Sequence, residues 1–480
     1  SYSDTNAKGE GISSAYLIGS IRSLYPKLEI EGGAGVRPHK NSINNYCYPE
    51  SPEAGIDLFL EKLVQETEKE HEDILEQADE TDAMFGELYS WYLRNPEYRS
   101  RVQKLVQSAF AGKPEDIISQ SVAKALYGEV SPYSATRLER FAACAFAHFL
   151  QYGMKLTERV EYEFKPMDMG NVMHEALESF AEEVRKRGMK WTELTEQERN
   201  EIADRCLDNI VADYGNTVLK SSARNEYMIE RTRRILRRTV WALQKQLEQG
   251  EFQPEGFEVT FGGGRIDRVD IMEDQNKVYV KVIDYKTGNT SFDLVYLYHG
   301  LQLQLMIYLD GALRVEQKKY PDKEIIPAGV FYYNIKDPMI QEKIDADVEA
   351  VSAGLMKELK MNGLVQADPE LVYRMDSSLG SIPVAFNKDG SFRKNSSVAD
   401  RTQFAVLGRY VRTKIEKIRS SILEGDAEVS PYELGKKNAC TYCPYMTVCG
   451  FDRRLSGYEF RRLKNFSDEE LWKAFDREAE

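Results

Sequence analysis

One stretch of the sequence decides the fold: FEVTFGGGRIDRVDIMEDQNKVYVKVIDYKTG, residues 257–288. Apolar and polar residues alternate along it with a period of two, whereas the preceding stretch to about residue 248 follows the helical period of about 3.6. The change of period predicts that the chain passes here from helices into strands, and that these strands form a β-hairpin.

Two carboxylates are expected to face each other on this hairpin. Side chains alternate across a strand, so Asp284 and Lys286 share a face with three valines, and Asp267 ends a similar apolar face on the first strand. With the turn centred between Gln275 and Asn276, Asp267 lies opposite Asp284, with Cβ atoms about 4.5–5.5 Å apart. Two like charges so close favour a bridging cation, and hard oxygen ligands favour Mg²⁺, with Mn²⁺ also possible.

The residues around this pair indicate phosphodiester hydrolysis. Lys286 can orient a water molecule and stabilise charge on a phosphate, while the metal activates the water. His174, on the apolar face of a helix that ends at Gly188, can add an imidazole ligand. The alternatives are ordinary: Asp-x-Lys occurs often by chance, Asp267 can pair with flanking arginines, and His174 can be a satisfied histidine of a partly buried face.

Other elements follow from local signals. In SPYSATRLERF, residues 131–141, Pro132 breaks the chain, and Thr136 with Glu139 predicts a capping box that starts a helix through about Gln151. Residues 55–113 are acidic and have apolar positions at helical spacing. Further expectations are a helix in GLQLQLMIYLDGAL, a strand in PAGVFYYNI, an exposed loop at about 377–396 and a last long helix at about 400–423.

The six cysteines are unevenly distributed. Cys440, Cys443 and Cys449 crowd into ten residues, which in a large intracellular chain suggests a metal site before a disulfide. A closed structural metal site needs four ligands. By pattern alone the fourth can be Cys144, Cys206 or Cys47 with equal right, and the metal can be zinc or iron–sulfur.

Charge and hydropathy limit the class of protein. The net charge is −14, so any nucleic-acid site must be a local basic groove rather than the whole surface. Two basic runs are candidates, one at 231–238 and one at 409–419, although such runs are usually solvated helix faces. No apolar stretch is long enough to span a membrane and no secretory leader opens the chain, so a cytoplasmic protein is expected. The chain begins at Ser1 and can be a piece of a longer protein.

With these residues in view, the chain resembles the PD-(D/E)XK nucleases of the RecB type and, more closely, AddB-type subunits of bacterial helicase–nucleases. GNVMHEALE, GRIDRVD, VIDYKTG and the pair Gln304-x-x-x-Tyr308 occur in that family's order. The resemblance implies an α/β fold, with a central mixed sheet flanked by helices and a four-cysteine staple, preceded by a mainly helical region. It makes His174, Asp267 and Asp284 metal ligands, Lys286 the catalytic lysine, and Gln304 and Tyr308 active-site support.

The resemblance also implies a domain plan and a cofactor. Residues 1–130 would be a mainly helical remnant of a helicase-like domain, 131–450 the nuclease domain and 451–480 a C-terminal tail. Cys144 would join the three late cysteines to hold a 4Fe–4S cluster, leaving Cys47 and Cys206 as ordinary buried thiols.

The implied function is a magnesium-dependent DNA nuclease subunit that processes double-strand ends for recombinational repair and cuts the 5′-ended strand. The resemblance also implies an AddA-type partner that carries the motor. The sequence itself contains no Gly-x-x-x-x-Gly-Lys-Ser/Thr phosphate loop, so it lacks an ATPase site of the usual kind. Two alternatives stay open, a stand-alone RecB-type exonuclease and an inert DNA-binding or assembly module. No membrane association is expected.

Overall fold

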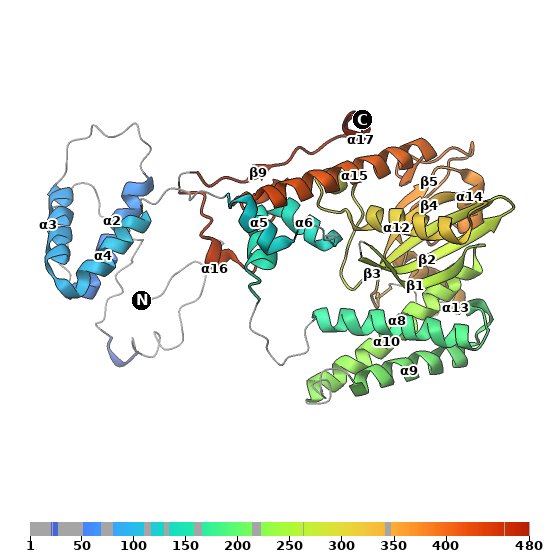
Figure 1. Cartoon of the computed structure of the whole chain (residues 1–480). Helices are drawn as coiled ribbons and strands as arrows, with labels where there is room; N and C mark the ends of the chain where they lie inside the picture. Colours follow the sequence, from blue (N-terminus) through green and yellow to red (C-terminus); the bar gives the residue numbers. More distant parts are fainter. Residues whose placement is uncertain are drawn as a thin grey trace. The chain divides into compact units, whose positions relative to one another are not determined.

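The computed structural model describes most of the chain (Figure 1), namely residues 21, 23–26, 51–68, 80–109, 117–128, 134–157, 166–213, 222–262, 264–340, 347–455 and 457–479. Two compact units are present, residues 1–111 and 112–480. Among the described residues of the first, α2 (Pro52–Glu68), α3 (Glu80–Arg94) and α4 (Pro96–Ala109) pack around a small core of Ile56, Phe59, Leu63, Tyr92 and Val102.

A six-stranded mixed sheet organises the second unit. Its spatial order follows the sequence, and the strands are β1 (Gln253–Phe261), β2 (Gly264–Asp274), β3 (Lys277–Lys286), β4 (Glu324–Asn334), β5 (Asn362–Gln366) and β6 (Val398–Ala399). The pairs β1·β2, β2·β3 and β4·β5 are antiparallel, while β3·β4 and β5·β6 are parallel. The predicted hairpin is β2–β3, and its turn residue Gln275 has a φ of +41°.

Helices cover both faces of the sheet (Figure 1), and the central strands β2, β3 and β4 are therefore buried along most of their length. One face carries α8 (Pro166–Lys186), α9 (Glu196–Asp213) and α10 (Ala223–Glu248), which pack on side chains such as Ile283 and Tyr285. The other face carries α12 (Gln304–Lys319) and α15 (Arg401–Glu424), which pack on Val280 and Val282. Alternate side chains of β3 therefore point into two different core layers, one on each face of the sheet.

Shorter elements complete the unit. They are α5 (Gln120–Tyr127), the 3₁₀ turn η4 (Trp191–Glu193), α11 (Leu294–Tyr298), α13 (Val348–Glu358), α14 (Pro369–Met375), α16 (Met446–Cys449) and α17 (Asp468–Ala479). A separate small sheet has the order β8 (Lys437–Asn438), β7 (Tyr432–Leu434), β9 (Arg461–Arg462). Helix α17 buries Leu471 and Phe475 in the same core layer as α15.

The capping box predicted at Thr136 and Glu139 is wrong. Helix α6 (Ala135–Ala143) begins earlier, where the hydroxyl of Ser134 accepts a hydrogen bond from the backbone N–H of Arg137. The helix also ends early, because Cys144 is extended, with φ −166° and ψ 118°. The chain then continues as α7 (Ala145–His148) and a π-helical turn, η3 (Phe149–Gly153).

Of two further expectations, one agrees with the structure and the other agrees only in part. The last long helix agrees closely with α15, whose N-cap is Asp400 and which ends at Gly425 with a φ of +94°. The exposed loop expected at 377–396 is only partly exposed, because Ile382 and Val384 are buried in the core. None of the helices in the described ranges combines the length and the apolar character that crossing a bilayer requires.

Candidate nuclease site

A row of three carboxylates crosses neighbouring strands of the sheet. The β2·β3 register pairs Arg268 with Ile283, so Asp267 and Asp284 occupy the next position of the two strands, as the sequence predicts. Instead of continuing the ladder, the carboxylate of Asp267 accepts a hydrogen bond of 2.7 Å from the backbone N–H of Tyr285. On the other side of β2, the β1 register brings Glu258 opposite Asp267.

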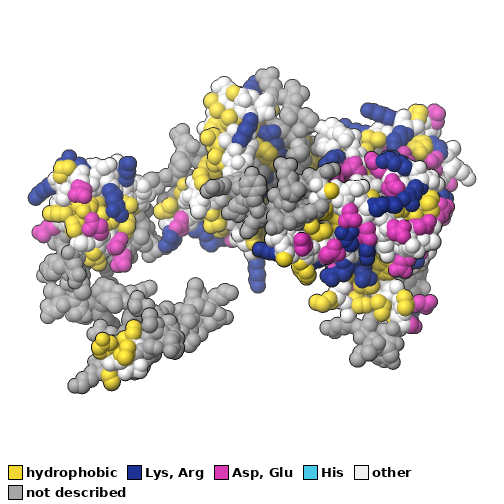
Figure 2. Space-filling model, turned by 90° about the horizontal axis from the view of Figure 1, so that it is seen from below, with side chains coloured by type: hydrophobic (Ala, Val, Ile, Leu, Met, Phe, Trp, Pro, Cys, Tyr) yellow, Lys and Arg dark blue, Asp and Glu magenta, His cyan; other side chains and the backbone are white. Residues whose placement is uncertain are grey.

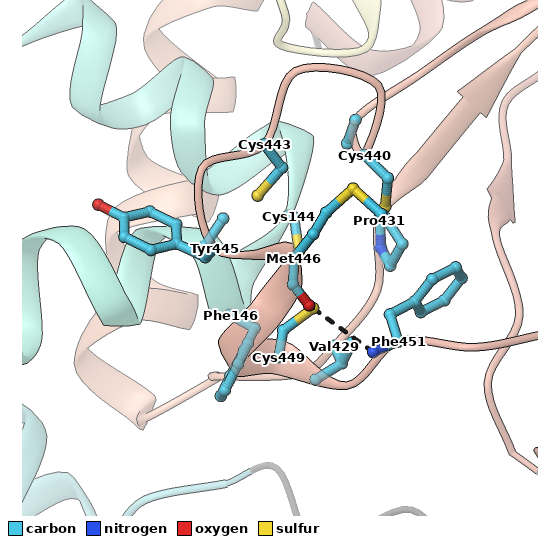
Figure 3. Close-up of a pocket in the computed structure, with 12 residues that line it drawn as sticks. Cys144, Phe146, Val429, Pro431, Cys440, Cys443, Tyr445, Met446, Cys449 and Phe451 are labelled. Atoms are coloured by element: carbon cyan, nitrogen blue, oxygen red, sulfur yellow. Dashed lines mark hydrogen bonds between the residues drawn. The ribbon is translucent and has the colours of Figure 1, made fainter. Parts of the chain in front are cut away.

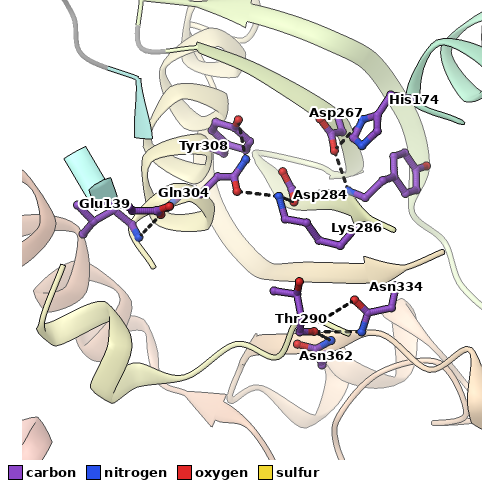
Figure 4. A network of polar contacts seen from close by, with 12 residues as sticks. Glu139, His174, Asp267, Asp284, Lys286, Thr290, Gln304, Tyr308, Asn334 and Asn362 are labelled. Atoms are coloured by element: carbon purple, nitrogen blue, oxygen red, sulfur yellow. Dashed lines mark hydrogen bonds and ion pairs between the residues drawn. The ribbon is translucent and has the colours of Figure 1, made fainter. Parts of the chain in front are cut away.

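His174 of α8 closes this row from the side. Its Nδ1 atom lies 3.4 Å from Oδ2 of Asp267 and 3.8 Å from Oε1 of Glu258 (Figure 4). Burial lowers the pKa of His174, but the carboxylates of Asp267 and Glu258 outweigh it and raise the pKa to about 10. The imidazole therefore lies in a strongly negative environment, of the kind that a cation neutralises.

Sequence reasoning missed Glu258. Its side chain is 9% exposed, and ligand atoms of His174, Glu258 and Asp267 all lie within 4.8 Å of one another. The backbone of Glu258 has a φ of +49°, a region that residues other than glycine rarely adopt. No sequence pattern indicates this conformation, and the bulge where the β1·β2 register shifts between Pro254 and Gly256 is equally hidden.

The predicted lysine and its helix partners come together. The ammonium of Lys286 lies 2.6 Å from Oδ2 of Asp284 and donates a hydrogen bond of 2.8 Å to Oε1 of Gln304 (Figure 4). The amide of Gln304 donates in turn to the hydroxyl of Tyr308 at 2.9 Å, across one turn of α12. Gln304 thus connects the lysine to the tyrosine. The contact between Gln304 and Tyr308 agrees with their i and i+4 positions on one helix face.

Burial controls the protonation of Asp284. The side chain is 1% exposed. Burial, and next the charge of Asp267, raise the pKa of Asp284 to about 7, while Lys286 acts in the opposite direction. An ionised carboxylate at this position needs a compensating positive charge, which one lysine supplies only in part.

Asparagine side chains hold the loop that follows Lys286. Asn334, at the end of β4, accepts a hydrogen bond from the backbone N–H of Thr290 and donates one to its carbonyl, both at 3.0 Å. Asn362, at the start of β5, donates to the same carbonyl at 2.8 Å (Figure 4). The chain leaving the lysine is therefore fixed to the sheet through β4 and β5.

Four cysteines line one pocket, at a distance from this row. Cys144, at the break after α6, faces Cys440, Cys443 and Cys449 of the C-terminal segment (Figure 3). The other lining side chains are largely apolar, among them those of Phe146, Val429, Pro431, Met446 and Phe451. Burial, followed by the other three thiols, raises the pKa of Cys440 to about 12. Cys206, on α9, is buried elsewhere, in the core layer that α8, α9 and α10 share, and Cys47 lies outside the described residues.

Many side chains of the two basic runs form ion pairs with other residues of the same unit. Arg233 and Arg237 of α10 pair with Asp204 of α9, and Arg234 pairs with Asp337. On the face that Figure 2 shows, Lys and Arg side chains are interspersed with Asp and Glu rather than gathered in one patch.

The second run is divided in the same way. The ammonium of Lys414 lies over the rings of Tyr298 and Tyr410, and Arg412 pairs with Asp310, whereas Arg409 is exposed.

Taken together, a mixed sheet covered on both faces and an Asp, Asp-x-Lys, His and Gln constellation define a nuclease of the PD-(D/E)XK class. The chain matches the model of the PD-(D/E)XK nuclease superfamily over residues 132–450, which include every residue of the site.

The names of curated relatives also indicate a nuclease. The chain is 38% identical over its whole length to the B-type subunit of the ATP-dependent helicase/deoxyribonuclease of Lachnoclostridium phytofermentans, and 32% identical to the protein of the same name from Alkaliphilus metalliredigens. The chain therefore belongs to the PD-(D/E)XK nuclease superfamily, and along its whole length it is similar to these B subunits. The chain spans 42% and 43% of the length of these two relatives.

Proposed function

We propose that this chain carries the metal-dependent deoxyribonuclease site of a helicase–nuclease complex. The observation that supports this most strongly is the row of Glu258, Asp267 and Asp284 across three adjacent strands, with Lys286 on the same face as Asp284. Arg265 pairs with Glu258 and Lys286 pairs with Asp284, but Asp267 between them has only His174 beside it, so a bound cation would stabilise this row of carboxylates.

The donor set fits a divalent metal. The ligands of one Mg²⁺ lie about 2.1 Å from it and hence at most about 4.2 Å apart, and the atoms of His174, Glu258 and Asp267 already lie within 4.8 Å of one another. His174, Asp267 and Glu258 form this close group, and Asp284, which lies outside it and pairs with Lys286, would complete the ligand set. When bound, Mg²⁺ would supply polarisation of the scissile phosphate and an acidified water.

The chain's own residues perform the remaining tasks. Lys286 is positioned by Asp284 and Gln304 so that its ammonium can stabilise charge on a phosphate oxygen. Tyr308 keeps the amide of Gln304 turned toward the lysine. The backbone bond from Tyr285 fixes the carboxylate of Asp267. Each of these groups is held by a second one, so little reorganisation accompanies the reaction.

The test is cleavage of end-labelled single-stranded and double-stranded DNA with Mg²⁺, with Mn²⁺ and with a chelator. Degradation that requires the metal and is lost in Asp284→Asn supports the proposal, whereas cleavage that survives the chelator contradicts it. Glu258→Gln should weaken Mn²⁺ binding, measured by electron paramagnetic resonance, without changing the melting temperature. Equal Mn²⁺ affinity in that variant would remove Glu258 from the ligand set.

We also propose that Cys144, Cys440, Cys443 and Cys449 hold a 4Fe–4S cluster. Their shared apolar pocket supports this. Sulfurs around a single tetrahedral zinc ion would lie about 3.8 Å apart. Across the described residues, however, the three-residue group of potential ligand atoms within 4.8 Å of one another is the histidine–carboxylate set, not a set of cysteines. A wider arrangement suits a polynuclear group. Anomalous scattering at the iron and zinc edges distinguishes the two.

The larger assembly is inferred from the relatives. Their name designates one component of an ATP-dependent helicase/deoxyribonuclease. We propose an AddA-type partner that carries the motor, double-strand DNA ends as substrate in recombinational repair, and cleavage of the 5′-ended strand. Digestion of duplexes labelled at either end, with and without the partner, tests the polarity. It also tests the stand-alone exonuclease, which would be fully active without a partner.

A further inference from the structure

Glu139 does not cap its own helix but a distant one. Its Oε1 atom accepts hydrogen bonds from the backbone N–H groups of Leu303, at 2.7 Å, and of Gln304, at 2.9 Å. These groups begin α12, where the first N–H groups of a helix have no partner within it. The N-cap residue Leu303 offers no side-chain hydrogen bond. Glu139 therefore supplies from α6 the cap that α12 lacks (Figure 4).

The capped residue is also the one that holds the catalytic lysine. Gln304 is the first residue of α12, and its side chain accepts the hydrogen bond of Lys286. Its backbone and its side chain are thus held by Glu139 on one side and by Lys286 on the other. A shift of the start of α12 moves the lysine relative to Asp284, and a misplacement of about 1 Å at a reacting group can cost about a hundredfold in rate.

The same helix leads directly to the cysteine pocket. Cys144 follows the last residue of α6, and its backbone N–H donates to the carbonyl of Arg140 at 3.1 Å. The guanidinium of Arg461, near the C-terminus, donates to the carbonyl of Ala142. Glu139 and Ala143, the last residue of α6, are four helical rises or about 6 Å apart, and Cys144 follows directly, so Glu139 lies on a short helical segment that is anchored at the end next to Cys144.

We propose that Glu139 is a positioning residue that sets Lys286 through Gln304, and that α6 transmits the anchoring of the cysteine pocket to the nuclease site. This inference rests on the proposed function. It differs from a general stabilising role of the cysteines, because it names one route, from Cys144 through Glu139 and Gln304 to Lys286.

The primary test compares kcat and KM of Glu139→Ala and Glu139→Gln with those of the wild type, using metal-dependent DNA cleavage. Glutamine keeps an acceptor oxygen for both N–H groups, so its kcat should stay within about threefold. Alanine should lower kcat about a hundredfold while leaving KM, Mn²⁺ affinity and iron content unchanged. Thr136→Ala, an exposed position on the same helix, is the matched control and should change nothing.

A double-mutant cycle separates positioning from simple loss of structure. In a Gln304→Ala background, Glu139→Ala should lower kcat by less than about twofold more, because the route is already broken. Cys440→Ser should likewise lower kcat by a smaller factor in the Gln304→Ala background than in the wild type. Additive effects in both cycles overturn the inference, as does a glutamine variant as impaired as alanine with unchanged iron content. A wild type without metal-dependent cleavage instead overturns the proposed function.

Discussion

The nuclease site and the cysteine pocket are assembled by opposite means. The carboxylates lie at neighbouring positions of adjacent strands, so backbone hydrogen bonds fix their spacing. The thiols come from the break after α6 and from the C-terminal segment of the same unit, far apart in the sequence. The first arrangement is set by register, whereas the second exists only once the whole nuclease domain has folded.

The chemistry of the two regions differs in the same sense. The strand site offers hard oxygen donors and one imidazole in a negative environment, and the pocket offers soft thiols among apolar side chains. The first is suited to chemistry on a phosphate, and the second to closing a long loop of chain. Changes in the first should remove activity without unfolding, and changes in the second should loosen the fold first.

The largest effect is expected from Asp284→Ala. This variant removes one of the facing carboxylates but little core volume, so cleavage should fall by roughly a thousandfold or more, the scale of losing a main transition-state interaction. The melting temperature should change little, because Lys286 keeps its hydrogen bond to Gln304 when the carboxylate is removed. Gel-based cleavage and calorimetric melting check both. Undiminished cleavage would remove Asp284 from the site.

Lys286→Ala should be nearly as severe, lowering kcat by roughly a hundredfold to a thousandfold. The lysine acts on water and phosphate rather than on the ion, so the variant should still bind Mn²⁺. Electron paramagnetic resonance measures the affinity. Loss of metal binding in this variant would contradict the role assigned to the lysine, because it would mean that Lys286 also helps to hold the ion.

The difference in assembly also explains what the sequence could and could not predict. The register of Asp267 against Asp284 follows from a period of two and one turn position, both visible in the sequence. The fold class and the pair Gln304 and Tyr308 follow from periodicity and from the family resemblance. Glu258 was missed because its position depends on a left-handed backbone conformation and a nearby bulge, which no local pattern encodes.

Glu139 was misassigned for a related reason. Three residues after Thr136 it fits a capping box, and local spacing cannot reveal that another helix with an uncapped start lies closer to its carboxylate. The fourth cysteine shows the same limit. Among Cys47, Cys144 and Cys206, spacing alone chose none, and only the packing of distant segments brings Cys144 to the other three.

A series of six single Cys→Ser variants tests the cysteine side of the comparison. Replacing Cys144, Cys440, Cys443 or Cys449 should remove about four irons per chain and lower the melting temperature by about 10 °C, since metal binding is coupled to folding. Proteolytic sensitivity should rise and activity should fall as a consequence. Cys206→Ser and Cys47→Ser serve as controls and should keep the iron. Loss of iron in Cys206→Ser with a brown Cys144→Ser would reassign the fourth ligand.

The smallest expected effect is a pH dependence of stability that comes from His148. The nuclease site and the cysteine pocket each have a histidine nearby, and the pKa values of the two are shifted in opposite directions. Whereas the pKa of His174 is raised, burial and the charge of Arg137 lower the pKa of His148, beside the cysteine pocket, to about 3. Its Nε2 atom accepts a hydrogen bond of 3.1 Å from Nε of Arg137, which requires a neutral ring.

Because the unfolded chain takes up this proton near the ordinary pKa of 6.5, its contribution is constant above that pH. Stability is then lost, by about 1.4 kcal/mol per pH unit, as the pH falls from 6.5 toward 3. His148→Gln keeps an acceptor for Arg137 but cannot be protonated, so it should lose less stability between pH 7.5 and pH 5 than the wild type does. Urea unfolding of both proteins at three pH values measures the difference, in which the titration of all other groups cancels. Parallel stability curves would mean that the pKa of His148 is the same in the folded and the unfolded chain, and that the surroundings of this ring are less strictly apolar than their packing indicates.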